Sequence, residues 1–209
     1  MNGKLIVFEG VEGCGKTTQM QLCSEWLQSL GVSVVVTREP GGTELGLHLR
    51  QILLDKAENK PISEVTELLL YAADRSQHVA QELKPNLEAG KYILCDRYTD
   101  STTAYQGYGR GLNMNLIQQL NSIATGGLES DLTIWLDVDV EVGMARKKGD
   151  KFDRIEQETI DFHRRVQQGY TELAASYPQR IIRVDGNLSQ EAVQTVIREV
   201  LTEKLSVNS

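Results

Sequence analysis

Eight consecutive residues near the N-terminus have the types and the spacing that bind nucleoside triphosphates. Gly10-Val11-Glu12-Gly13-Cys14-Gly15-Lys16-Thr17 matches the pattern GxxxxGK[ST]. Glycines allow such a loop to wrap so that successive backbone N–H groups point at phosphate oxygens. Lys16, which we expect in a solvated loop, would reach the β- and γ-phosphates, and the Thr17 hydroxyl would ligate Mg²⁺. The loop predicts binding of a nucleoside triphosphate, and it leaves the reaction open.

A second set of polar residues follows two apolar runs further along the chain. Asp96-Arg97-Tyr98 comes directly after residues 92–95. An aspartate at the end of a buried strand commonly supports a phosphate-bound Mg²⁺, and Arg97 beside it could bridge two phosphate groups. Arg38-Glu39-Pro40-Gly41-Gly42-Thr43 ends another run, and its proline and glycines predict a shaped loop. Taken alone, this loop fits a plain turn equally well.

Residues 65–83 have the period of a two-faced helix. The stripe predicted to be buried consists of Val65, Leu68, Leu69, Ala72, Ser76, Val79 and Leu83. Tyr71, Asp74, Arg75 and His78 lie on another face. Tyr71 and Arg75 are four residues apart and therefore neighbours, so the ring could stack on a base while the guanidinium donates hydrogen bonds to it. The alternative is that this polar face is only solvated.

These residues must be positioned by a fold that alternates strands with helices. Five short apolar runs rich in β-branched residues are predicted strands, at 5–8, 32–37, 92–95, 132–137 and 181–185. Helical segments separate them, including 17–30, which ends at Gly31, and a last helix that Ser189 opens. The alternation predicts an α/β fold with a mostly parallel sheet. No linker or repeat divides residues 1–209, so we expect a single domain.

Composition excludes several classes of protein. The chain has 209 residues, of which 40% are hydrophobic and 24% charged, as in ordinary globular proteins. Its net charge of −7 makes it a poor general binder of nucleic acid. No apolar run approaches the roughly 18 residues that span a bilayer, so we expect no membrane span. Three cysteines without CxxC spacing indicate reduced thiols and a cytoplasmic location.

Taken together, these segments resemble the thymidylate kinase family over essentially the full chain. The matching motifs are FEGVEGCGKTTQ at 8–19, TREPGGT at 37–43, Leu49-Arg50, LLLYAADRSQH at 68–78, DRYTDSTTAYQG at 96–107, LDV at 136–138 and FDRIEQE at 152–158. The resemblance implies the fold of the P-loop nucleoside monophosphate kinases, with a five-stranded parallel sheet surrounded by helices. It also implies transfer of the γ-phosphoryl group of ATP to dTMP, giving dTDP and ADP, with Mg²⁺, in a homodimer.

The resemblance assigns roles position by position. The implied ATP-binding residues are Gly10, Val11, Glu12, Gly13, Cys14, Gly15, Lys16, Thr17 and Thr18. The implied dTMP-binding residues are Glu12, Arg38, Arg50, Tyr71, Arg75, Arg97, Ser101, Thr102 and Tyr105. The implied catalytic residues are Lys16, Asp96, Arg97, Arg146, Lys147 and Lys148, and the implied metal ligands are Thr17 and Asp96.

Within the dTMP set, each part of the nucleotide has its own implied partners. The arginines at 38, 50 and 97 would hold the phosphate. Tyr71 would stack on thymine, and Arg75 would donate to a thymine carbonyl. Ser101 and Thr102 would approach the far edge of the base. Glu12 would bind the 3′-hydroxyl, and Tyr105 would pack under the sugar.

A basic segment at about 145–154 is the implied mobile lid over ATP. Its cations are Arg146, Lys147, Lys148, Lys151 and Arg154. Some family members instead carry an arginine inside the phosphate loop, where this chain has Gly13. Lysine lacks the bidentate fork of arginine, so the sequence leaves open which lid cation acts in the transition state.

Two alternatives to a dTMP kinase remain at this point. The first is another P-loop nucleotide or nucleoside kinase. A nucleoside kinase would need a base for a sugar hydroxyl, whereas a monophosphate kinase needs the extra arginines present here. The second, from a different class, is a regulator that binds a nucleoside triphosphate without transferring a phosphoryl group.

Overall fold

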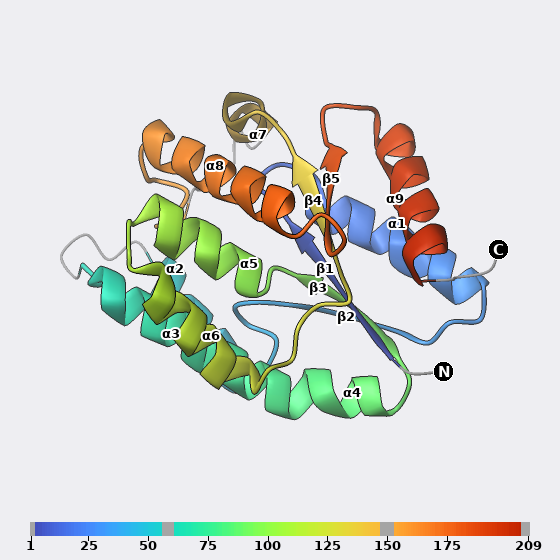
Figure 1. The fold of residues 1–209 in the computed structure, drawn as a ribbon, viewed down its shortest axis with the longest axis horizontal. Helices are drawn as coiled ribbons and strands as arrows, with labels where there is room; N and C mark the ends of the chain where they lie inside the picture. The colour runs from blue at the N-terminus through green and yellow to red at the C-terminus, as the bar shows by residue number, and fades with distance from the viewer. Residues whose placement is uncertain (1–2, 56–60, 147–152, 206–209) are drawn as a thin grey trace.

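The computed structural model describes residues 3–55, 61–146 and 153–205. Its five strands are β1 (Lys4–Glu9), β2 (Val34–Arg38), β3 (Tyr92–Asp96), β4 (Leu132–Asp137) and β5 (Ile181–Asp185). They form one parallel sheet in the order β2-β3-β1-β4-β5 (Figure 1). The predicted five-stranded parallel sheet is therefore confirmed, and every predicted strand overlaps an observed one.

Helices connect the strands. The α-helices are α1 (Lys16–Ser29), α2 (Glu44–Leu54), α3 (Glu64–His78), α4 (Lys84–Glu88), α5 (Thr99–Thr102), α6 (Met114–Thr125), α7 (Val140–Arg146), α8 (Ile160–Ser176) and α9 (Gln190–Leu205). Two π-helical turns, η1 (Val79–Leu83) and η2 (Thr103–Gly109), continue α3 and α5. No helix among these described residues is both long and apolar enough to cross a membrane.

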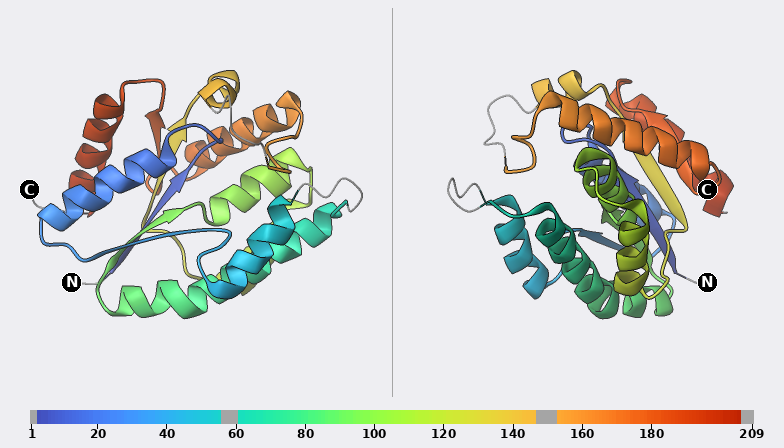
Figure 2. Two further views of the ribbon diagram at one scale, coloured as in Figure 1. Left: turned by 180° about the vertical axis from the view of Figure 1, so that it is seen from behind. Right: turned by 60° about the vertical axis from the view of Figure 1, so that its left-hand side comes forward.

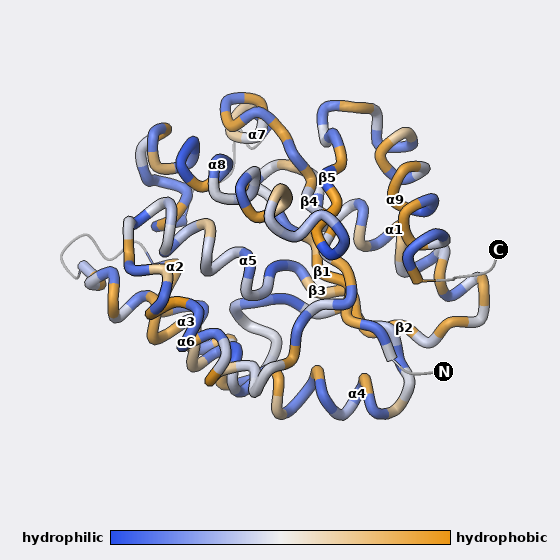
Figure 3. Tube along the Cα trace, in the orientation of Figure 1, coloured by the Kyte–Doolittle hydropathy of each residue, from blue (hydrophilic) through white to orange (hydrophobic). Residues whose placement is uncertain are grey.

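Helices cover both faces of the sheet because successive strand side chains point to opposite faces. Ile6 and Phe8 of β1 pack into a core with α1 and α9, whereas Leu5 and Val7 pack into a core with η1. A third core around Trp135 contains residues of η2 and α8. Figure 3 shows hydrophobic strand segments between these helical layers. Helix α3 packs against both α2 and α6 (Figure 2).

The prediction for the two faces of residues 65–83 was partly wrong. Leu68, Val79 and Leu83 are buried as expected, but Val65 and Leu69 are 47% and 49% exposed. The polar face, with Asp74, Arg75 and His78, is buried instead. The physical reason is that these polar groups have hydrogen-bond partners on the loop after β2, which makes their burial possible.

The carboxyl ends of the central strands bring the polar motifs together. Asp96 of β3 lies opposite Phe8 of β1 and opposite Arg38 of β2 in the strand register. Glu9 ends β1 immediately before the phosphate loop. In parallel α/β sheets this edge is where ligands bind.

Candidate functional site

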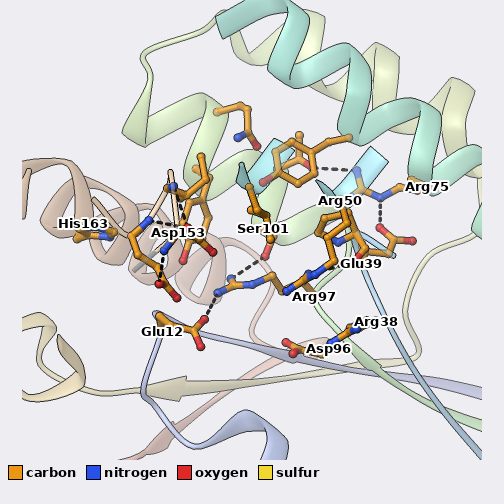
Figure 4. A pocket seen from close by; sticks show the side chains of 18 of the residues that line it. Glu12, Arg38, Glu39, Arg50, Arg75, Asp96, Arg97, Ser101, Asp153 and His163 are labelled. Atoms are coloured by element: carbon orange, nitrogen blue, oxygen red, sulfur yellow. Dashed lines mark hydrogen bonds and ion pairs between the residues drawn. The ribbon is translucent and has the colours of Figure 1, made fainter. Parts of the chain in front are cut away.

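A cavity of about 220 Å³ opens at the carboxyl ends of β1, β2 and β3. All nine side chains of the predicted dTMP-binding set line it: Glu12, Arg38, Arg50, Tyr71, Arg75, Arg97, Ser101, Thr102 and Tyr105. Thr17 and Asp96 line it as well, so the cavity reaches the phosphate loop. Figure 4 shows Arg38, Asp96 and Arg97 close together, with Arg75 and Glu39 at another side. The fold therefore gathers the nine predicted residues, which are up to 93 positions apart in the sequence, from Glu12 to Tyr105.

The phosphate loop joins β1 to α1 as the sequence predicts, but the expectation that Lys16 is solvated was wrong. Lys16 is only 5% exposed, because it opens α1 and its Nζ turns back onto the loop. There it donates to the carbonyl oxygens of Gly10, at 3.2 Å, and Val11, at 3.3 Å. Burial and Arg97 lower the pKa of Lys16, but the Cys14 thiol and the Asp96 and Glu12 carboxyls outweigh them and raise it. The side chain stays a cation.

Gly13 is required by packing as well as by loop conformation. Its φ is +75°, in the left-handed region that favours glycine. A Cβ at this position would collide with the carbonyl oxygen of Gly143 in α7. An arginine at position 13 is therefore incompatible with this arrangement of the loop and α7.

Thr17 and Asp96 fit the role of Mg²⁺ ligands. One carboxylate oxygen of Asp96, Oδ1, is buried without a hydrogen-bond partner in the part of the chain that the structure describes. Thr17 lies on the first turn of α1 and lines the same cavity. The described ranges contain no cluster of three or more His, Cys, Asp and Glu side chains suited to a metal. Such a sparse protein site is typical of Mg²⁺, which usually takes its other ligands from substrate phosphates and water.

Arg97 has an unusual backbone and a crowded side chain. Its φ is +70°, and in the described ranges it is the only residue other than glycine with a positive φ. This conformation is costly for a residue with a Cβ, and such strain is concentrated at functional sites. The guanidinium lies over the Tyr105 ring, 5.0 Å from its centre, and contacts Glu12 Oε2 at 3.5 Å.

Arg38 and Arg50 complete a positive wall of the cavity. Arg50 of α2 donates to the carbonyl oxygen of Pro40 at 3.1 Å. Burial and the neighbouring Arg38 lower the pKa of Arg50. Two arginines that share one wall repel each other, so a dianionic phosphate between them would be strongly favoured.

Arg75 is held by a buried ion pair that the sequence did not reveal. Its Nε donates to Glu39 Oε2 at 2.8 Å, and His78 contacts Glu39 Oε1 at 2.9 Å. Arg75 also donates to Thr102 Oγ1 and to the Tyr98 carbonyl oxygen. Glu39 and Arg75 are 3% and 2% exposed. The only feature of the sequence that pointed to Glu39 was its place in the TREPGGT motif.

We expect Arg75→Lys to weaken both the fold and thymine recognition. Lysine keeps the charge but cannot donate to Glu39, Thr102 and Tyr98 together. Each buried acceptor left without its donor costs about 1–3 kcal/mol. Thermal unfolding should therefore show a large loss, and the KM for dTMP should rise more than that for ATP. A variant with unchanged unfolding temperature would contradict the buried pair, and an unchanged KM for dTMP would contradict the role at the base.

Of the predicted lid cations, the structure describes Arg146 and Arg154, and both donate to other groups of the protein. Arg146 lies at the end of α7 and donates to the Gly186 carbonyl oxygen. Arg154 donates to the Leu53 carbonyl oxygen and to Glu67 Oε2 at 2.6 Å. Neither lines the cavity. Lys147, Lys148 and Lys151 lie outside the described residues, so the lid and its catalytic cations stay predictions.

Comparisons with known proteins agree with this geometry. The family model described as thymidylate kinase matches residues 8–197. The chain is 83% identical to a thymidylate kinase of Nostoc punctiforme over 203 residues, covering 96% of each chain. It is 77% identical to that of a Nostoc strain over 207 residues, covering 98% of each. A crystal structure of thymidylate kinase from Ehrlichia chaffeensis aligns with TM-score 0.80 and 34% identity, over 96% of this chain and 100% of that one. The chain belongs to the thymidylate kinase family.

Proposed function

We propose that the cavity is the dTMP site of an ATP-dependent dTMP kinase and that the phosphate loop beside it holds ATP. Membership of the family makes the chain a phosphotransferase that forms dTDP and ADP. The observation that carries the assignment of the site is the convergence of all nine predicted acceptor residues on one cavity that also reaches Thr17 and Asp96. A regulator without phosphotransfer has no need of this acceptor cavity.

The arrangement suits phosphoryl transfer between two phosphates. The acceptor phosphate is already a nucleophile at neutral pH, so no strong general base is needed. Lys16 would hold the donor phosphates, and Arg97 would contact the acceptor phosphate and the group in transfer. Mg²⁺, held through Asp96 and Thr17, would neutralise charge on the donor phosphates. Catalysis then consists of alignment and charge stabilisation by groups that are already in position.

An acceptor assay tests this proposal. The protein is incubated with ATP, with and without Mg²⁺, and with dTMP, dUMP, dCMP or thymidine, and the products are separated by chromatography. We expect dTDP from dTMP, much less product from the other acceptors, and none without the metal. Phosphorylation of thymidine instead of dTMP would contradict the acceptor assignment, and ATP hydrolysis without nucleotide product would favour the regulator.

We also propose that the protein is a cytoplasmic homodimer that pairs through α2, α3 and α6. Seven large apolar side chains of these helices are strongly exposed: Leu45, Leu47, Ile52, Val65, Leu69, Leu116 and Ile123. Helix α3 packs against both α2 and α6, so the seven lie on adjoining helices (Figure 2). Extended apolar surfaces of this kind mark interfaces.

Ile123→Glu should convert the dimer to a monomer. Ile123 is 77% exposed, and a charge there would be buried at the interface without a partner. Sedimentation velocity should show the mass fall by half. Leu188→Glu is the matched control, because Leu188 is also exposed, at 47%, but lies outside these helices. Monomeric wild-type protein would refute the dimer, and an unchanged mass of Ile123→Glu would refute this interface.

A further inference from the structure

A buried carboxylate behind the cavity binds four hydrogen-bond donors. Glu9 is fully buried at the end of β1. Its Oε1 accepts from the backbone N–H groups of Tyr98, at 2.9 Å, and Ser101, at 3.1 Å. Its Oε2 accepts from the Ser101 hydroxyl at 2.6 Å and the Tyr170 hydroxyl at 2.7 Å. Four donors match the hydrogen-bonding capacity of an ionised carboxylate.

The two hydroxyls connect Glu9 to Arg97. Nη1 of Arg97 lies 3.2 Å from Ser101 Oγ and 3.5 Å from Tyr170 Oη. The two hydroxyl oxygens also lie 3.0 Å apart, so one hydroxyl can donate to the other. Each oxygen still has a lone pair that can accept from the guanidinium. Glu9 and Arg97 are therefore linked through two hydroxyls. The pKa of Glu9 is raised on balance, because burial and the nearby Asp100 outweigh the opposing effects of Arg97 and the two hydroxyls.

Tyr170 is the distant member of this network. It lies on α8, which follows the predicted lid in the sequence, and its ring stacks on Trp135 of β4 at 5.9 Å between centres. The side chain is 1% exposed and does not line the cavity. No motif or spacing in the sequence pointed to Tyr170. Because its side chain does not line the cavity, we expect no direct contact with dTMP.

We propose that Tyr170 is a positioning residue, which, with Glu9 and Ser101, fixes the Arg97 guanidinium in the orientation that phosphoryl transfer requires. This inference rests on the proposed action of Arg97 on phosphate. Tyr105 and Glu12 are the other contacts of the guanidinium, and both are expected to contact the sugar of dTMP. Glu9 and Tyr170 do not line the cavity, so they support Arg97 from the side away from the substrate.

Tyr170→Phe tests the proposal because it removes only the hydroxyl and keeps the ring on Trp135. We expect kcat to fall about 10- to 100-fold, the size expected for a small misplacement of a catalytic group. The KM values for ATP and dTMP should change less than about threefold, since the binding groups remain. Thr133→Val is the matched control: Thr133 of β4 is fully buried, its hydroxyl donates to Asp100 Oδ2 at 3.0 Å, and it does not line the cavity. It should lose comparable thermal stability with kcat within about twofold of wild type.

A double-mutant cycle separates positioning from general weakening of the fold. In the Arg97→Lys background, Tyr170→Phe should lower kcat by less than about twofold, because the group it orients is gone. An equal loss of kcat in both backgrounds, or a loss matched by Thr133→Val, overturns the positioning role. Arg97→Lys with wild-type kcat would overturn the proposed action of Arg97 itself. If Arg97→Lys is impaired and Tyr170→Phe is not, only the inference about Tyr170 fails.

Discussion

Replacing Lys16 by methionine should lower kcat by at least about 10²–10³-fold, which is the loss typical of one preorganised charge-stabilising donor. Lys16 is the cation of the phosphate loop, and its Nζ is 3.2–3.3 Å from two loop carbonyl oxygens. On binding ATP, we expect Nζ to exchange these neutral acceptors for phosphate oxygens, to which a charge-assisted bond is stronger. Methionine fills the same space and cannot make that exchange.

The same replacement should affect stability little, although Lys16 is buried. Each hydrogen bond to a carbonyl contributes about 1 kcal/mol net, and removing a buried charge offsets part of that loss. Thermal unfolding should thus shift by a few degrees at most. Lys91→Met serves as the control. Lys91 also donates a hydrogen bond, to Asn86 Oδ1, but it precedes β3, at the end of the strand away from Asp96 and the cavity. A folded Lys16→Met protein with kcat within about tenfold of wild type, roughly 1.4 kcal/mol, would refute the phosphate-loop assignment.

The strands and the phosphate loop could be predicted because their signals are local. A run such as 132–137 is buried on both faces inside the sheet, so most of its residues are apolar and it stands out in the sequence. The loop glycines likewise reflect the local backbone, as at Gly13. The strand pattern and the loop glycines depend only on neighbouring residues and on their backbone conformation. They can therefore be recognised in the sequence.

The buried polar groups could not be predicted because their partners are distant in the chain. Glu9 interrupts an apolar run and would normally end a strand at the surface; it is buried because Ser101 and Tyr170, 92 and 161 residues away, donate to it. His78 and Arg75 share Glu39 in the same way. Helical period alone placed Val65 and Leu69 of α3 in the core and left out Arg75 and His78, since it counts polar side chains as solvated.

Replacing Arg97 by lysine should cause the largest single loss of activity, about 10³- to 10⁵-fold in kcat, the range for an arginine that stabilises a phosphoryl transition state. Lysine retains the charge, so electrostatic attraction of dTMP persists, but it cannot contact two phosphates and both bridging hydroxyls at once. Because the group in transfer gains its extra charge only in the transition state, kcat should fall far more than the KM for dTMP rises.

A structural arginine provides the comparison that isolates this effect. Arg180 makes a bidentate ion pair with the buried Asp100, at 2.7 and 2.8 Å, and does not line the cavity. Arg180→Lys should therefore lower the unfolding temperature at least as much as Arg97→Lys, yet leave kcat within about threefold of wild type, because no group it touches meets substrate. If Arg97→Lys raised the KM for dTMP while kcat stayed unchanged, Arg97 would bind the acceptor phosphate alone, and the cation acting on the group in transfer would have to come from the predicted lid.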